Sequence, residues 1–94
     1  FGPRALRRFR ENLTAGLEQG RTLGWKRALA GAREAEGVLP AEAFGHNGFT
    51  GTSVWLDPLA GRSYVLLTNR VHPEVRPIDM NLLRRGFHEV ASRL

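Results

Sequence analysis

Apolar residues recur at helical spacing near the start of the chain. Four of them follow one another at intervals of three or four residues, and these are Leu6, Phe9, Leu13 and Leu17. This pattern predicts a helix that begins after Pro3, because proline fits a first turn, where its missing N–H would have no partner. Gly16 and Gly20 would end the helix. Its polar side would face solvent, with Arg4, Arg7, Arg8 and Glu11.

The same period returns over residues 79–94, which Pro77 precedes. One stripe of this second predicted helix is apolar and contains Met80, Leu83, Phe87, Val90 and Leu94. We expect Arg84, Arg85 and Arg93 to face solvent, and His88 to lie at the surface or at its boundary.

Between the helices, three segments have the composition of strands. Residues 21–27 predict a short strand, and residues 48–56 predict a longer one, in which β-branched and aromatic residues alternate with small ones. Asp57-Pro58 ends the second strand, and Gly61 marks a hairpin. Residues 63–68 contain the apolar run Tyr64-Val65-Leu66-Leu67, which is typical of a central strand covered on both faces.

Residues 28–44 lack a clear period and contain the breakers Gly31, Gly37 and Pro40, so they predict a loop. Its glutamates, which we expect to be solvated rather than paired for catalysis, are Glu34, Glu36 and Glu42. The order helix, strand, loop, strand, strand, helix predicts an α+β fold, an antiparallel sheet with flanking N- and C-terminal helices. Two helices cannot cover both faces of a central strand, so this fold requires further protein.

Composition narrows the possible functions. The chain has 94 residues and a net charge of +5, and its lack of cysteine excludes disulfides, a thiol nucleophile and a thiolate zinc site. No apolar run is as long as a membrane span, and the compartment stays open. His46, His72 and His88 have no spacing typical of metal ligands, so we predict no metal or cofactor.

The positive charge allows a second hypothesis, a small basic module that binds nucleic acid or an acidic partner. Its contacts would come from the arginines near the start, Arg4, Arg7, Arg8 and Arg10. However, no aromatic residues are interleaved to stack on bases, and the chain has one lysine. A solvated helix face explains these arginines better, so we do not expect nucleic acid as a partner.

Glycines stand at positions 45, 48 and 51, around His46. Their spacing matches neither the Walker pattern nor the Gly-x-Gly-x-x-Gly pattern of phosphate-binding loops. They lead into a predicted strand, where they would let a ligand approach the backbone and its N–H groups. A binding edge and a plain bulge both fit this pattern.

Three stretches together resemble a known family. They are His46-Asn47-Gly48-Phe49-Thr50-Gly51-Thr52-Ser53-Val54-Trp55-Leu56-Asp57-Pro58, the later Leu66-Leu67-Thr68-Asn69-Arg70-Val71-His72-Pro73, and Leu23-Gly24-Trp25. The chain resembles the C-terminal segment of the serine β-lactamase-like and penicillin-binding-protein-like family. It is most similar to members related to class C β-lactamases, DD-peptidases and esterases of the same fold. The resemblance covers essentially all of residues 1–94.

The resemblance implies roles for five residues. His46 stands where the family has a Lys or His that assists proton movement and anchors substrate. Asn47 replaces the usual Thr or Ser in substrate recognition, and Gly48 keeps the strand bare so that substrate can lie along it. The backbone N–H of Phe49 corresponds to one of two oxyanion-hole donors. Arg76 lies near the position of an arginine beside the substrate carboxylate.

The family's nucleophile is missing from this chain. None of Ser53, Ser63 and Ser92 is followed by Lys three residues later, and Tyr64 does not begin a Tyr-x-Asn element. The resemblance implies that these groups belong to an upstream segment or a second chain that completes the domain. The first residue, Phe1, is not Met, which agrees with a segment. We therefore expect a serine hydrolase of small amides or esters, inactive as residues 1–94 alone.

Overall fold

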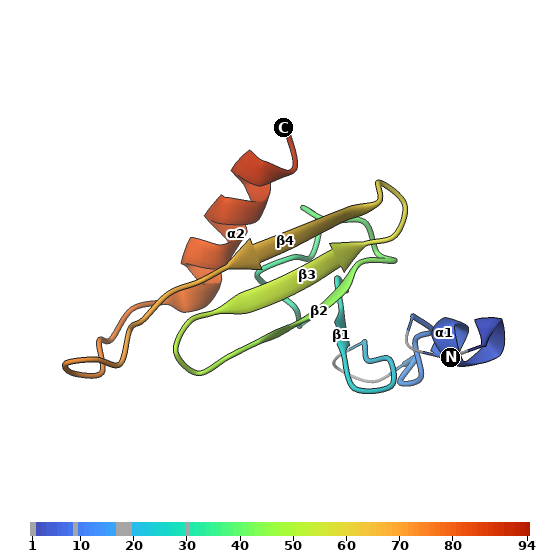
Figure 1. The fold of residues 1–94 in the computed structure, drawn as a ribbon, viewed down its shortest axis with the longest axis horizontal. Helices are drawn as coiled ribbons and strands as arrows, with labels where there is room; N and C mark the ends of the chain where they lie inside the picture. The colour runs from blue at the N-terminus through green and yellow to red at the C-terminus, as the bar shows by residue number, and fades with distance from the viewer. Residues whose placement is uncertain (1, 9, 17–19, 30) are drawn as a thin grey trace.

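The computed structural model describes residues 2–8, 10–16, 20–29 and 31–94. A four-stranded antiparallel sheet in the order β1-β2-β3-β4 is flanked by a helix at each end of the chain (Figure 1). The elements are α1 (Pro3–Arg8), β1 (Lys26–Arg27), β2 (Phe44–Asn47), β3 (Ser53–Asp57), β4 (Arg62–Leu66) and α2 (Met80–Ala91). The predicted α+β fold is confirmed. Neither helix in the described part of the chain has the length and apolar character to cross a membrane.

The sheet has one covered face. Trp55 in β3 pairs with Gly45 on one side and Tyr64 on the other, and the side chains of Trp55 and Tyr64 are buried. Gly45 is required here, because an added Cβ would lie 2.5 Å from Cδ2 of the Trp55 ring. Strand alternation puts Asn47 on this same face, two residues along from Gly45.

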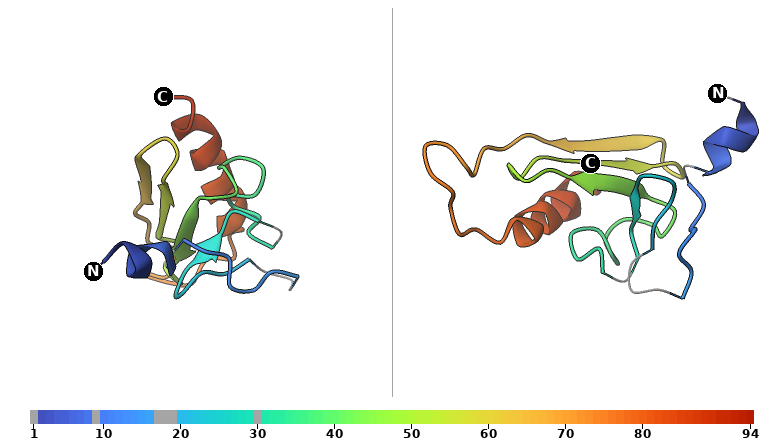
Figure 2. Two further views of the ribbon diagram at one scale, coloured as in Figure 1. Left: turned by 90° about the vertical axis from the view of Figure 1, so that its right-hand side faces the viewer. Right: turned by 90° about the horizontal axis from the view of Figure 1, so that it is seen from below.

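Helix α2 and residues 28–43 both lie against the covered face (Figure 2). The buried apolar cluster forms between them and the sheet, and it consists of Ala28, Ala32, Ala35, Leu39, Ala43, Trp55 and Tyr64. The 28–43 loop contributes four small alanines and Leu39 to this cluster. The loop is therefore part of the core, although it contains no long helix or strand.

The opposite face of the sheet is open in the described structure (Figure 2). Phe44 and His46 of β2 alternate onto it, opposite Leu56 and Val54 of β3. Val65 of β4 continues this face and is 53 % exposed. The open face therefore carries apolar side chains around an imidazole.

Helix α2 confirms the predicted C-terminal helix and corrects its solvent face. Oδ1 of Asp79 accepts hydrogen bonds from the backbone N–H groups of Asn81 and Leu82, which caps the first turn. Arg84 and His88 were predicted at the surface, but both are buried. The prediction was wrong because Met80, Arg84 and His88 lie four residues apart and share the side that meets the sheet.

His88 is a core residue. Its ring lies 6.1 Å from the Trp55 ring and 5.8 Å from the Tyr64 ring, and its Nδ1–H donates to the backbone carbonyl of Glu34 at 2.6 Å. Its Nε2 is buried without a partner in the described structure. Burial lowers the pKa of His88, although the bond to the Glu34 backbone and the nearby Glu34 charge oppose this shift. The folded state therefore holds a neutral imidazole.

The N-terminal helix is shorter than predicted. It ends at Arg8, and Phe9 and Leu17 of the expected stripe lie outside the described residues. Leu6 and Leu13 are 53 % and 44 % exposed, so the stripe makes no core contact in the described structure. A helical period alone rarely holds a short helix, because most helical stability comes from packing of the apolar face.

Two predicted strands are also shorter. Residues 21–27 fold back on themselves at Gly24, which has φ of +87°, and only Lys26–Arg27 pair with β2. Residues 48–52 form a turn, with a hydrogen bond of 2.7 Å from the Gly48 N–H to the Thr52 carbonyl. Gly51, at φ +100°, allows this reversal, so the predicted strand over 48–56 divides into a turn and β3.

The predicted central strand is at the edge of the described sheet. β4 pairs with β3 alone, and Leu67 just beyond it is 80 % exposed. The apolar run was read as covered on both faces, but the described chain provides one covering layer. Glu34 was predicted to be solvated and is instead fully buried, because the 28–43 loop packs beneath the sheet.

We predict that acid destabilises the fold through His88. The unfolded state takes up a proton near the ordinary pKa of 6.5, whereas the folded state resists it, so this contribution is complete above that pH and declines as the pH falls below it. Thermal unfolding from pH 8 to pH 5 measures the effect. His88→Asn, which keeps a side-chain donor for the Glu34 carbonyl, should flatten the decline between about pH 6.5 and 5.5. An unchanged profile in this variant would contradict the assignment.

Candidate active site

The edge of β2 is open from His46 onward. The short strand β1 pairs only with Phe44 and Gly45, so the following residues have no strand neighbour on that side in the described structure. His46 is exposed, and its Nδ1 lies 3.0 Å from the Asn47 carbonyl. A carbonyl can only accept, so this contact places a proton on Nδ1 and leaves Nε2 of the neutral ring as an acceptor.

A shallow hollow of about 320 Å³ lies beside His46. It is lined by His46, Asn47, Gly48, Thr52, Ser53, Val54, Val65 and Leu67. Apolar side chains from β3 and β4 form one side, and the bare backbone at Gly48 forms the other. The hollow brings three of the predicted site residues together, His46, Asn47 and Gly48.

The side chain of Asn47 points into a buried polar network. Its Nδ2 donates to Glu34 Oε1 at 2.5 Å, and its Oδ1 accepts from the Trp55 indole N–H at 3.4 Å. Lys26 Nζ donates to the same Glu34 oxygen at 2.9 Å. Both polar atoms of the Asn47 amide therefore have partners beneath the sheet, which leaves the backbone of this residue as its polar group at the open edge.

Glu34 is charged in this network. Burial by itself raises the pKa of the Glu34 carboxyl. Hydrogen bonds from Lys26, from its own backbone and from Asn47 lower this pKa by more than burial raises it, so the net shift is downward. Its second oxygen, Oε2, is buried without a hydrogen bond in the described structure. The carboxylate is thus committed to Lys26 and Asn47 and is unsuited to acid or base chemistry at the edge.

The turn after β2 leaves backbone donors free, since no acceptor is found among the described residues for the N–H groups of Phe49, Thr50 and Thr52. Its carbonyls all accept hydrogen bonds, whereas the Phe49 N–H has no acceptor among the described residues. The Gly48 carbonyl accepts from Nη2 of Arg84, which comes from α2. In a trans peptide the N–H points opposite to the carbonyl, so the Phe49 N–H points away from α2. His46 faces that same side.

The resemblance placed an arginine at Arg76, but another arginine contacts the turn. Arg70 Nε donates to the Phe49 carbonyl at 2.7 Å, and its guanidinium lies 4.5 Å from the centre of the Phe49 ring. Arg76 is exposed, and within the described structure its hydrogen bonds are two backbone bonds, from its N–H to the Arg70 carbonyl and from the Ile78 N–H to its own carbonyl. Sequence reasoning predicted Phe49 and did not identify the two arginines that contact this turn, Arg70 and Arg84.

A signal for Arg84 was present in the chain. Met80, Arg84 and His88 recur every four residues, so an arginine on this line should have been expected to face the sheet. Glu34 and Arg70 lie in segments without periodicity, and their burial or contacts depend on residues distant in the chain. Within the described residues, no group of three His, Cys, Asp or Glu side chains could hold a metal ion.

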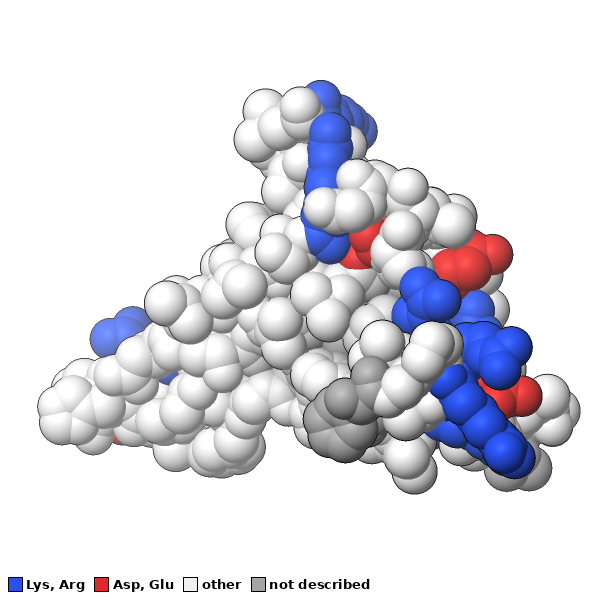
Figure 3. All heavy atoms as spheres, turned by 45° about the vertical axis from the view of Figure 1, so that its right-hand side comes forward, with Lys and Arg blue, Asp and Glu red and all other residues white. Residues whose placement is uncertain are grey.

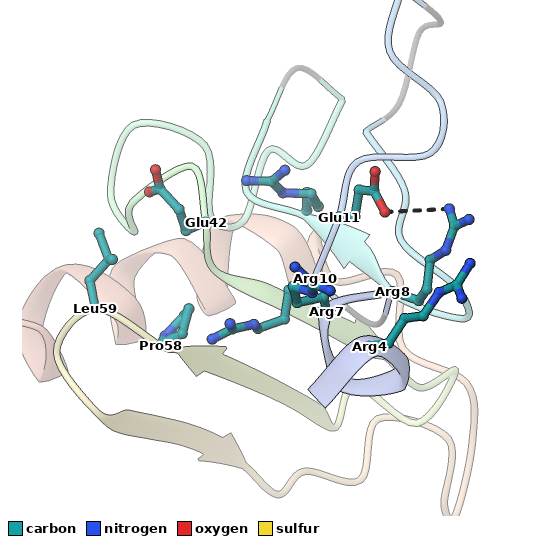
Figure 4. A pocket seen from close by; sticks show the side chains of 9 residues that line it. Arg4, Arg7, Arg8, Arg10, Glu11, Glu42, Pro58 and Leu59 are labelled. Carbon is teal, nitrogen blue, oxygen red and sulfur yellow. Dashed lines mark hydrogen bonds and ion pairs between the residues drawn. The ribbon is translucent and has the colours of Figure 1, made fainter. Parts of the chain in front are cut away.

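A larger cavity of about 630 Å³ lies near α1, at the other end of the sheet from the turn after β2. Lys and Arg gather along this flank of the molecule (Figure 3). Figure 4 shows the lining, which comprises Arg4, Arg7, Arg8, Arg10, Glu11, Arg27, Glu42, Pro58 and Leu59. Arg8 pairs with Glu11 at 3.4 Å, and Arg27 is bound to the Ala41 carbonyl. The carboxylates of Glu11 and Glu42 offset part of the positive charge of this lining, whereas Arg27 keeps its charge when it donates to a neutral carbonyl.

We predict that Glu34→Gln destabilises the fold. The amide keeps the shape of the carboxylate but leaves the nearly buried Lys26 ammonium without its countercharge, which should cost about 3 kcal/mol of unfolding free energy. Denaturant unfolding measures this loss. Glu36→Gln is the matched control, because the exposed Glu36 side chain makes no recorded ion pair with a described residue. Equal stability of the two variants would contradict a structural role for the Glu34 charge.

Comparison with known proteins provides one match. A family model described as beta-lactamase matches residues 3–88. The matched region includes the edge of β2, the turn that follows it and Arg84. Neither the curated proteins nor the solved structures contain a significant match.

Proposed function

The chain belongs to the beta-lactamase family, and we propose that it forms one wall of the active site of a serine hydrolase. In the proposed reaction, a serine oxygen attacks an acyl carbonyl, an alcohol or amine leaves, and water then releases the acid from the acyl-serine. Residues 1–94 lack a Ser-x-x-Lys sequence. We propose that the nucleophile and its lysine come from the remainder of the same domain, which packs against the open face of the sheet.

One observation supports this role most strongly. The Phe49 N–H has no acceptor in the described structure, and since the Gly48 carbonyl of the same peptide faces Arg84 of α2, we infer that this N–H points to the side of the sheet on which His46 lies. Attack on a carbonyl places negative charge on its oxygen, and a fixed N–H aimed at that oxygen stabilises the transition state by about 3–4 kcal/mol. We propose that Phe49 supplies this donor, and that His46 Nε2 moves a proton or binds the substrate.

The other predicted residues shape the substrate path. We propose that substrate lies along the open edge at Asn47 and Gly48 and is held through their backbone groups. A side chain at Gly48 would meet the Thr52 hydroxyl, since an added Cβ would lie 2.5 Å from Oγ1. Arg76 is exposed and would reach a substrate carboxylate only at the outer end of this path.

We further propose an uncharged ester as the substrate class, in preference to a carboxylate-bearing β-lactam. Position 47 lacks a hydroxyl, and both polar atoms of the Asn47 amide have partners in the interior. A site with no donor at this position would bind a carboxylate weakly.

The test of the proposed function is turnover by the complete polypeptide that contains these residues. We expect it to hydrolyse a short chromogenic ester faster than a chromogenic β-lactam, and we expect purified residues 1–94 to hydrolyse neither. Robust turnover by the short chain would overturn the division of roles, because its three serines lack the partner lysine. No turnover of either substrate by the complete polypeptide would overturn the proposal itself.

A second prediction concerns the Phe49 N–H. Phe49→Pro deletes this donor, and we expect it to lower kcat/KM for the ester by about 100-fold. Phe49→Ala is the matched control, because it removes the ring and keeps the N–H, so its activity should stay within about threefold of the unsubstituted protein. Both variants need the same melting temperature for the comparison. Equal losses of kcat/KM in the two variants would contradict the assignment of the Phe49 N–H as the donor.

A further inference from the structure

Arg84 is a buried cation without a carboxylate partner in the described structure. The residue is 6 % exposed, and none of the ion pairs between described residues involves it. Its Nη1 donates to Asn81 Oδ1 at 2.8 Å on its own helix. The remaining donors reach the turn after β2, with Nε on the Gly51 carbonyl at 3.1 Å and Nη2 on the Gly48 carbonyl at 3.1 Å.

Burying a charged side chain to donate hydrogen bonds to carbonyl groups costs free energy of desolvation. Removing a cation from water carries a large penalty that carbonyl dipoles offset only in part. Burial lowers the pKa of Arg84, the Glu34 charge opposes this shift, and the Arg70 charge adds to it. The guanidinium carries five donors on three nitrogens, so this one side chain can serve several carbonyls of the turn at once, which a neutral amide with two donors cannot do.

Arg84 helps to fix the direction of one peptide group, whose carbonyl, that of Gly48, also accepts from the Gly51 N–H at 3.1 Å. The Gly48 carbonyl is drawn toward α2, and the planar trans peptide then directs the Phe49 N–H away from α2. The bond to the Gly51 carbonyl holds the far end of the turn, and Nη2 also lies 3.5 Å from the Thr52 carbonyl. The guanidinium thus fixes the turn at both ends, and rotation of the Gly48–Phe49 peptide would break its bond.

From these contacts we propose that Arg84 is a positioning residue, which holds the Gly48–Phe49 peptide so that the Phe49 N–H faces the reacting carbonyl. The proposal rests on the proposed function of that N–H. The cation also lies at the negative end of the peptide dipole, where it polarises the group and strengthens the N–H as a donor. Arg84 touches no reacting atom in this scheme and acts through the backbone of Gly48.

The activity test compares Arg84→Gln and Arg84→Lys in the complete polypeptide. We expect Arg84→Gln to lower kcat for the ester by about tenfold or more, with KM within about twofold, because the donor acts mainly on the transition state. Arg84→Lys retains the charge and can still reach a carbonyl, so it should recover part of kcat. It also provides the measurement if Arg84→Gln fails to fold.

Arg85→Gln is the matched control. Arg85 follows Arg84 on the same helix and donates to the carbonyls of Arg33 and Glu36, and no contact of its side chain with the turn is recorded in the described structure. We expect its kcat to match that of the unsubstituted protein. If folded Arg84 variants keep full kcat, or if Arg85→Gln loses as much, the positioning role is wrong.

Two spectroscopic measurements separate this role from simple anchoring of the helix. In the acyl-enzyme, the ester carbonyl stretch should move to higher wavenumber in Arg84→Gln, because a misdirected N–H polarises the carbonyl less. In the protein without substrate, the amide resonance of Phe49 should shift, and its hydrogen exchange should accelerate by about tenfold relative to β3 amides.

The amide measurement does not depend on turnover. If the unsubstituted polypeptide hydrolyses no substrate while Arg84→Gln alters the Phe49 amide, the proposed function fails and the control of the peptide by Arg84 stands. An unchanged Phe49 amide in Arg84→Gln would overturn the inference whatever the activity.

Discussion

The buried carboxylate of Glu34 is the interaction on which the rest of the structure depends. One of its oxygens accepts from Lys26 of β1 and from Asn47 of β2. The backbone carbonyl of the same residue accepts from His88 of α2. A carboxylate with no solvent exposure is tolerable only with such partners, so the 28–43 loop, two strands and the helix must assemble together. The 28–43 loop has little regular structure, but the bonds of Glu34 to β1, β2 and α2 hold it in place as a layer beneath the sheet.

This assembly gives the sheet two unlike faces. The loop and α2 occupy the face of Trp55 and Tyr64, and the register then directs His46 to the other face. A slip of one residue in β2 would exchange His46 with Asn47 and break the bond to Glu34. The buried network therefore sets which side chain of the pair reaches the open face. The buried charge of Glu34 on the covered face therefore decides that His46 is presented at the open edge of β2.

Several parts of this fold were predictable from local signals. The C-terminal helix follows from its period and from Pro77, and the β3–β4 hairpin follows from Asp57-Pro58 and Gly61. The resemblance across residues 46–58 and 66–73 indicated the family that the comparison confirmed. Each of these signals lies in consecutive residues, which is why the sequence was sufficient.

The errors concern polar residues that the fold buries. Glu34, Arg84 and His88 were assigned to the surface because charged and polar side chains are seldom buried without partners. Their partners lie far away in the chain, as Arg84 and the Gly48 carbonyl show at a separation of 36 residues. Residue type alone cannot reveal such a pairing. The strand boundaries failed for a related reason, since pairing and glycine conformation overrode β propensity in residues 48–52.

The candidate site combines both kinds of information. The motif predicted His46 and the Phe49 N–H, which lie three residues apart in the chain, but not the groups that direct them. That direction comes from Glu34 through Asn47 and from Arg84 through the Gly48 carbonyl. Both act from the covered face on groups that point to the open one. A polar residue buried beneath a bare strand edge is therefore best understood by asking which backbone or side-chain group on the other side it orients.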